Sequence, residues 1–162
     1  MGYTFDYLVG ELRCAFCDTV SGADERTNMT TRLRDEPGLA FLGVGDKLPV
    51  DTERALKADY LLVREPAPGE AVVLLHLWTC PSCGGAWNWA EVAVRDGVIE
   101  SVREALLNQE TLARVNFVVE DIRDVAADLA GSSSPFALDD EGVVAVLRER
   151  LRVGGGWTPG EG

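Results

Sequence analysis

Apolar and polar positions give the first two thirds of the chain a pattern typical of strands. Residues 39–45 (LAFLGVG) predict a short strand, and residues 59–78 (DYLLVREPAPGEAVVLLHLW) predict two strands joined by a Pro/Gly turn. Residues 86–94 (AWNWAEVAV) and 98–104 (VIESVRE) predict a hairpin, because the Asp96-Gly97 dipeptide between them favours a type I′ turn. The polar residues 21–38 predict a loop.

The period changes to that of a helix after residue 107. Apolar residues recur at steps of three and four from Leu112 to Leu129, which predicts one helix with Asn108 at its start and Gly131 at its end. A second helix is predicted from about residue 139 to 152, with acidic residues at its start and arginines at its end. Two helical turns with Asp51 as N-cap are predicted earlier, over residues 51–58.

These elements predict an α+β fold with a small antiparallel sheet and two C-terminal helices. A chain of 162 residues with 46% apolar residues is long enough to bury one core. We therefore expect one domain over residues 1–152. Residues 153–162 (VGGGWTPGEG) have the composition of a disordered tail.

The charge is strongly acidic, with 27 acidic and 15 basic residues and a net charge of −12. The excess of acids runs along the whole chain, so no basic stripe is available for a phosphate backbone, and nucleic acid is an unfavoured partner. The charge instead favours attraction to a basic protein. Because the sequence starts without a secretory pattern and its longest apolar run, residues 71–78, is too short to span a bilayer, we expect a cytoplasmic protein without a membrane segment.

All four cysteines fall into two C-x-x-C pairs, Cys14/Cys17 and Cys80/Cys83. Two residues between thiolates let one tight turn direct both sulfurs at a single ion. Two such turns complete a tetrahedral site of four sulfurs, the coordination typical of structural zinc. The sequence therefore predicts a zinc ion held by these four cysteines.

The second pair, within CPSCG, resembles the knuckles of zinc-ribbon and rubredoxin-like proteins. The resemblance covers the two knuckles and the hairpin that follows the second, and it implies a zinc ion, or iron as in a rubredoxin, at the four cysteines. The first knuckle, CAFCDT, has no glycine after its second cysteine, and the 62 residues from 18 to 79 separate the knuckles. The resemblance thus implies a zinc-ribbon-like site that holds the N-terminal segment on a larger α+β core.

A redox dithiol is the main alternative for Cys80 and Cys83. A thioredoxin-like site needs a helix that starts at the first cysteine and lowers its pKa. Gly84 and Gly85 are followed here by a strand pattern, and the dithiol would leave Cys14 and Cys17 without a role. Iron at the same four sulfurs is a further alternative.

The aromatic residues near the second knuckle and the sole histidine, His76, complete the candidate site. We expect His76 to be a hydrogen-bonded core residue or an outer neighbour of the metal ligands, and Trp78 to pack against the site. Trp87 and Trp89 share one face of their predicted strand, which is either core or a surface for a partner.

Four sulfur ligands leave a zinc ion no open position, so we expect a structural ion and a non-enzymatic protein. Its expected partner is another protein, with the acidic chain acting as a regulator, inhibitor or immunity-type partner of a basic protein. Two alternatives stay open: a nucleic-acid-binding zinc ribbon and a redox protein. The first requires a basic face, for which the candidates are Arg13, Arg26, Arg32 and Arg34.

Overall fold

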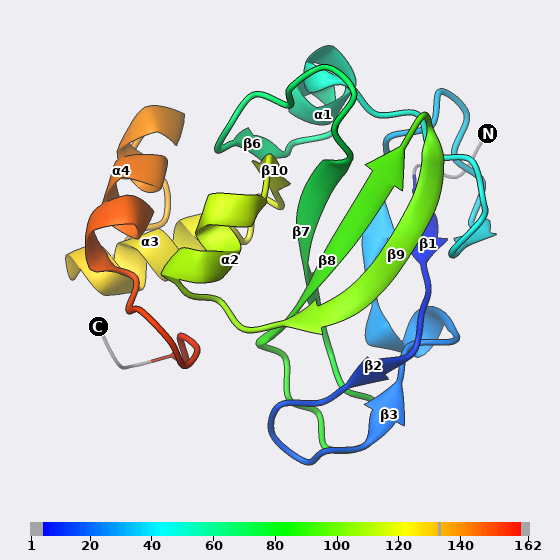
Figure 1. The fold of residues 1–162 in the computed structure, drawn as a ribbon. Coiled ribbons are helices and arrows are strands. Elements are labelled where there is room, and N and C mark those ends of the chain that lie inside the picture. Colours follow the sequence, from blue (N-terminus) through cyan, green and yellow to red (C-terminus); the bar gives the residue numbers. More distant parts are fainter. Residues whose placement is uncertain (1–4, 133, 160–162) are drawn as a thin grey trace.

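The computed structural model describes residues 5–132 and 134–159 and has the expected α+β fold (Figure 1). Its main sheet has five strands. In spatial order they are β6 (Leu61–Leu62), β10 (Phe117–Val118), β7 (Val72–Trp78), β8 (Asn88–Arg95) and β9 (Val98–Ala105). All neighbours in this sheet are antiparallel except β10 and β7, which are parallel. The expected antiparallel sheet is therefore mixed at one pair.

Short strands and helices surround this sheet. A three-stranded sheet consists of β4 (Thr30–Thr31), β1 (Asp6–Leu8) and β5 (Phe41–Leu42), and β2 (Leu12–Arg13) pairs with β3 (Val20–Ser21). The helices are the 3₁₀ turn η1 (Glu25–Thr27), α1 (Thr52–Lys57), α2 (Gln109–Arg114), α3 (Ile122–Ala130) and α4 (Asp140–Arg150). The predicted loop over residues 21–38 thus contains η1 and β4.

The β8–β9 hairpin forms where the turn dipeptide predicts it. Asp96 and Gly97 have φ angles of 52° and 75°, the left-handed conformation that both central residues of a type I′ turn require. Strand β7 pairs with β8 along the whole length of β7, from Val72 opposite Val94 to Trp78 opposite Asn88. These three strands are the longest in the described chain, and the shorter elements pack around them.

The predicted single helix over residues 108–131 is wrong, because strand β10 divides it into α2 and α3. Both predicted ends are confirmed: Asn108 accepts a hydrogen bond from the Thr111 amide at 2.9 Å, and Gly131 takes a left-handed φ of 69°. Between them, Phe117 and Val118 are buried on opposite faces of the sheet. Successive side chains of a strand point to opposite faces of the sheet, so a strand can bury both Phe117 and Val118. An amphipathic helix would bury only one stripe of its residues.

Asn116 fixes this inserted strand between its neighbours. Its side chain accepts a hydrogen bond from the Val73 amide at 2.9 Å and donates one to the Arg64 carbonyl at 3.0 Å. Its backbone bonds to residues on the same two sides. The two strands predicted within residues 59–78 are therefore β6 and β7, but β10 lies between them and the pair forms no hairpin.

The other predicted helices are confirmed. Asp51 caps α1 by accepting a hydrogen bond from the Arg54 amide at 2.8 Å. Asp139 caps α4 in the same way, through the Gly142 amide at 2.8 Å. No helix among the described residues is long and apolar enough to cross a membrane.

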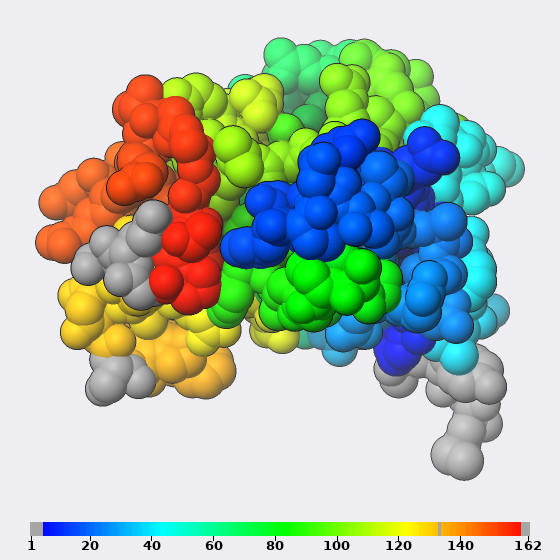
Figure 2. All heavy atoms as spheres, turned by 90° about the horizontal axis from the view of Figure 1, so that it is seen from below, coloured from blue at the N-terminus to red at the C-terminus, as the bar shows by residue number. Residues whose placement is uncertain are grey.

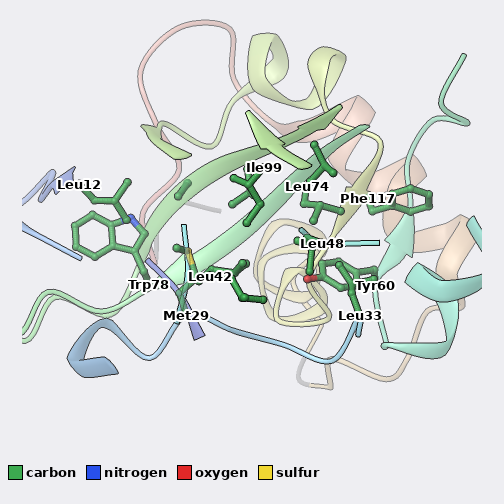
Figure 3. Packing of buried hydrophobic residues seen from close by; sticks show 14 of the residues in the cluster. Leu12, Met29, Leu33, Leu42, Leu48, Tyr60, Leu74, Trp78, Ile99 and Phe117 are labelled. Carbon is green, nitrogen blue, oxygen red and sulfur yellow. The ribbon is translucent and has the colours of Figure 1, made fainter. Parts of the chain in front are cut away.

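The two faces of the main sheet bury separate apolar clusters. One face packs against the N-terminal strands, and Figure 3 shows this cluster with Leu12 and Trp78 at one end and Tyr60 and Phe117 at the other. The opposite face packs against α2, α3 and α4, which lie together on one side of the sheet in Figure 1. Leu74 and Leu75, adjacent on β7, enter different clusters. The central strand thus contributes to both.

Asp6 anchors the N-terminal strands beneath the first face. Its buried carboxylate accepts hydrogen bonds from the Arg34 guanidinium and from the amides of Gly38 and Ala40. Burial acts to raise the pKa of Asp6, but these bonds outweigh it and the pKa is lowered. The carboxylate therefore holds residues 34–40 against β1.

The C-terminal segment differs from the disorder predicted for residues 153–162. Trp157 is buried, its amide donates to the Leu107 carbonyl at 2.8 Å, and its indole N–H donates to Asp128 at 3.0 Å. The free energy gained by burying the large Trp157 side chain offsets the conformational entropy that is lost when the glycines around it become ordered. Residues 160–162 lie outside the described part.

We predict that Asn116→Ala lowers the free energy of unfolding by about 2 kcal/mol, because it removes the side-chain acceptor of the half-buried Val73 amide and the donor to the Arg64 carbonyl. Chemical denaturation measures the change. Glu149→Ala, an exposed position on the same chain, is the control and should change stability by less than about 0.5 kcal/mol. Equal stability of Asn116→Ala and the unaltered chain would contradict the role given to this side chain.

Candidate metal centre

Four cysteines from two distant segments meet at one end of the main sheet. Cys14 and Cys17 lie in the turn between β2 and β3, and Cys80 and Cys83 lie in the turn between β7 and β8. All four sulfur atoms are within 4.8 Å of one another. Across the two turns, the Cys14 and Cys83 sulfurs lie 3.6 Å apart and the Cys17 and Cys80 sulfurs 3.7 Å apart.

The two turns have the same backbone design. The Asp18 amide donates to the Cys14 carbonyl at 3.0 Å, and the Gly84 amide donates to the Cys80 carbonyl at 2.8 Å. Asp18 and Gly84, each directly after its second cysteine, have left-handed φ angles of 66° and 76°. An aspartate tolerates this conformation better than most residues. The first knuckle therefore needs no glycine where the second has one.

Amide groups point at the sulfurs, as expected for thiolate ligands. The Phe16 amide donates to the Cys14 sulfur at 3.3 Å, and the Gly85 amide donates to the Cys83 sulfur at 3.4 Å. Hydrogen bonds of this kind favour the charged form of a thiol. Each knuckle thus supplies a donor to one of its own sulfurs.

Asn88, the first residue of β8, ties the two knuckles together. Its side-chain oxygen accepts from the Ala15 amide at 3.0 Å, and its side-chain nitrogen donates to the Cys14 sulfur at 3.4 Å and the Gly85 carbonyl at 3.2 Å. Asn88 is buried. Sequence reasoning did not single it out, although a polar residue on the inward face of an alternating strand is the signal that could have done so.

The pKa values of Cys14, Cys17 and Cys83 shift in different directions. Burial acts to raise the pKa of Cys14, but the amides of Cys17 and Phe16 and the side chain of Asn88 outweigh it and lower the pKa to about 6. Cys17, which shares hydrogen bonds with Thr19, also has a lowered pKa. The Gly85 amide acts to lower the pKa of Cys83, yet burial and the other three sulfurs raise it to about 12. Four thiolates at this spacing repel one another unless a cation lies among them.

The geometry fits a tetrahedral metal ion. With a zinc–sulfur distance of about 2.3 Å, the sulfurs of a regular tetrahedron lie about 3.8 Å apart. The two cross-turn separations, 3.6 and 3.7 Å, agree with this value and are far longer than a disulfide bond of about 2.05 Å. All four cysteines are free. Cys14, Cys17, Cys80 and Cys83 are therefore placed to hold one metal ion.

Comparison with known proteins assigns the chain to no family. No protein-family model matches the chain, and neither the curated proteins nor the solved structures yield a match to it. The likeness to zinc-ribbon knuckles accordingly rests on the two turns themselves. The helix that a thioredoxin-like dithiol requires is not found after Cys80, since residues 81–83 form a turn and β8 begins at Asn88.

His76 lies in the core and bonds to groups other than the four sulfurs. Its Nε2 atom shares a hydrogen bond of 2.6 Å with the Tyr60 hydroxyl, which shares another of 2.8 Å with the Thr31 hydroxyl. Burial lowers the pKa of His76 to about 3, so the ring is neutral. The sequence predicts either a hydrogen-bonded core histidine or an outer neighbour of the metal ligands, and these contacts match the core histidine.

The tryptophans form two groups. Trp78 is buried in the same cluster as Cys14 and Cys80 and donates its indole N–H to the Trp89 carbonyl at 3.1 Å. Trp87 lies on the other face, with its ring centroid 6.2 Å from that of Trp89 and 5.1 Å from that of Trp157. Trp89 is 3% exposed, and its indole nitrogen is a buried side-chain donor without a partner among the described residues.

The arginines proposed as a basic face are each paired with an aspartate. The pairs are Arg13 with Asp18, Arg26 with Asp24, Arg32 with Asp59, and Arg34 with Asp6. Their charges are therefore offset locally. Nothing in these contacts favours a nucleic-acid backbone.

We predict that the stability contributed by His76 is lost on acidification. The unfolded chain takes up a proton below the ordinary histidine pKa of 6.5, whereas folded His76 stays neutral until its pKa of about 3. Falling pH in this window therefore favours unfolding, and the contribution is complete above pH 6.5. Between pH 7 and about pH 5 the loss should be about 2 kcal/mol, measured by urea denaturation.

The matched variant is His76→Gln, which has no titrating group in this pH range. Any acid sensitivity of the cysteine site is common to both proteins and cancels in the difference between their slopes. Equal pH slopes for the two proteins would contradict a neutral, buried His76.

We predict that Asn88→Ala weakens metal binding by about tenfold or more, because the residue bonds to a ligand sulfur and to both knuckles. Competition with a chelator measures the change. Asn108→Ala is the matched control, since it removes a helix cap and costs about 1 kcal/mol of stability without contacting the cysteines. A similar loss of affinity in both variants would show that the effect is one of general stability.

Proposed function

We propose that the chain is a non-enzymatic cytoplasmic protein that binds one structural zinc ion through Cys14, Cys17, Cys80 and Cys83 and acts by binding another protein. The observation that carries the zinc proposal is the gathering of four free sulfurs from two distant turns within 4.8 Å, with two cross-turn distances, 3.6 and 3.7 Å, close to the tetrahedral spacing. The proposed cytoplasmic location agrees with it, because paired free thiols persist in a reducing compartment and bind metal there.

A structural role follows from the ligand count. Four protein sulfurs complete a tetrahedral zinc ion and leave no position for a reacting water. The sole histidine, the commonest general base, is buried and bonded to Tyr60. Both features support a protein that works by binding.

The proposed ion would hold the β2–β3 hairpin on the main sheet. Strands β2 and β3 have two residues each, too few to hold a hairpin in place alone. A metal bound to both turns would attach this hairpin to the end of the main sheet. Zinc would then contribute directly to the free energy of folding.

The partner proposal rests on charge. A net charge of −12 favours a basic protein and disfavours nucleic acid, so we propose a small acidic regulator, inhibitor or immunity-type partner. The redox alternative uses the same sulfurs with iron in place of zinc, and metal analysis separates the two.

The protein should carry one zinc ion per chain by elemental analysis. Cys80→Ser should lower the zinc content and the melting temperature together, the latter by roughly 10 °C or more, because the three remaining cysteines lose the cation that joins the two turns. Ser82→Ala, an exposed position in the same turn, is the control and should keep both.

Two outcomes would count against this proposal. A metal-free Cys80→Ser protein with an unchanged melting temperature would refute the structural role. One iron ion per chain and a red colour would contradict zinc and indicate a rubredoxin-like iron centre.

A further inference from the structure

A groove runs between the first knuckle and the C-terminal segment. Two adjoining hollows of about 320 and 270 Å³ make it up, and they share a set of lining residues. The shared residues are Ala15, Phe16, Asn88, Trp89, Ala105 and Leu106. Figure 2 shows the two sides of this knuckle–tail groove, with the blue N-terminal segment beside the red C-terminal segment.

The groove exposes large apolar side chains. Phe16 is 51% exposed and Leu106 is 49% exposed, and the half-buried Trp87 lies at the end nearer the C-terminal segment. Apolar surface gathered in one concave place gains free energy when a partner covers it. Aromatic residues are also the usual anchors of protein interfaces.

Trp89, which lines both hollows, has an unsatisfied hydrogen-bond donor. Its indole nitrogen is buried and bonds to no described residue, whereas the indole groups of Trp78 and Trp157 have acceptors. A buried donor without an acceptor is destabilising, and such groups are rare in folded proteins. A main-chain carbonyl brought in by a partner, with the side-chain adjustments common at interfaces, would satisfy it.

The rim of the groove is acidic. Arg13 is the one cation among the lining residues and pairs with Asp18 at 3.3 Å. Glu104 accepts a hydrogen bond from the Arg13 amide and forms no ion pair among the described residues. The groove therefore attracts a cation and repels phosphate.

We infer that the knuckle–tail groove is the docking site for a protein segment that carries an apolar anchor residue next to a lysine or arginine. This inference rests on the proposed partner-binding function and gives it a location. The anchor packs against Phe16 and Leu106, the basic residue lies near Glu104, and a main-chain carbonyl reaches the Trp89 indole.

The metal centre builds one wall of this groove. Ala15 and Phe16 lie between two of the ligand cysteines, and the Ala15 amide is fixed by Asn88. Docking therefore requires an intact first knuckle, and binding should be lost when Cys14 and Cys17 release the metal.

A displayed library of random peptides, selected on the metal-loaded protein, tests the inference. Enriched peptides should share an apolar residue within one or two positions of a lysine or arginine. Leu106→Asp should weaken a synthetic enriched peptide by about tenfold or more, and Glu104→Gln by about threefold with a smaller salt dependence. Val44→Asp, at another exposed apolar position outside the groove, is the control and should bind as the unaltered protein does.

The four tryptophans supply an internal readout by nuclear magnetic resonance. Binding should move the Trp89 indole proton downfield, whereas the Trp78 and Trp157 indole protons, already hydrogen-bonded, should move less. Replacement of each tryptophan by phenylalanine assigns the signals. A Trp89 signal that does not move in the presence of saturating peptide would overturn the carbonyl contact.

Several outcomes overturn the groove while leaving the metal proposal intact: no enriched peptide, peptides without the motif, or binding unaffected by Leu106→Asp. Self-association that Leu106→Asp abolishes would also overturn it, by making a second copy of the chain the occupant. Conversely, peptide binding that depends on Leu106 in a protein stripped of zinc would sustain the groove and overturn its dependence on the metal.

Discussion

The mutual repulsion of four thiolates within 4.8 Å is the constraint on which one end of the molecule depends. The turn amides and Asn88 stabilise negative charge at this point, and they do so before any cation is considered. The raised pKa of Cys83 has the same origin: despite the hydrogen bond from the Gly85 amide, burial and the three neighbouring sulfurs disfavour a thiolate there. A divalent cation at this point would resolve the conflict, and the short β2–β3 hairpin would then gain an attachment that its own hydrogen bonds do not provide.

Away from the cysteines, the long strands β7, β8 and β9 organise the fold. They separate an apolar cluster beneath the N-terminal strands from a second cluster beneath α2, α3 and α4. Several short elements are fixed onto this platform by single polar side chains, as Asp6 fixes residues 34–40 and Asn116 fixes β10. Such buried groups are fully bonded, so each specifies one arrangement of its loop.

Much of this could be predicted where local chemistry decides the structure. The Asp96-Gly97 turn and the caps at Asp51, Asn108 and Asp139 depend on residues within one turn of each other. The four cysteines could be found because ligand spacing is also local. Strand β10 could not, because the period of its apolar residues also fits a helix and only the two neighbouring strands decide between them. The packing of Trp157 likewise depends on distant residues, Leu107 and Asp128.

Adjacent residues of β8 serve the two sides of the molecule. Asn88 bonds to the knuckles, and Trp89 packs in the cluster beneath the helices. Side chains alternate along a strand, so this division depends on the pairing register that sets Asn88 opposite Trp78 and Trp89 opposite Leu77. A slip of one residue in this register would turn an indole toward the sulfurs and the side-chain amide of Asn88 toward the helices, even with every cysteine retained. The register of β8 against β7 is therefore as restrictive for the site as the identity of the ligands.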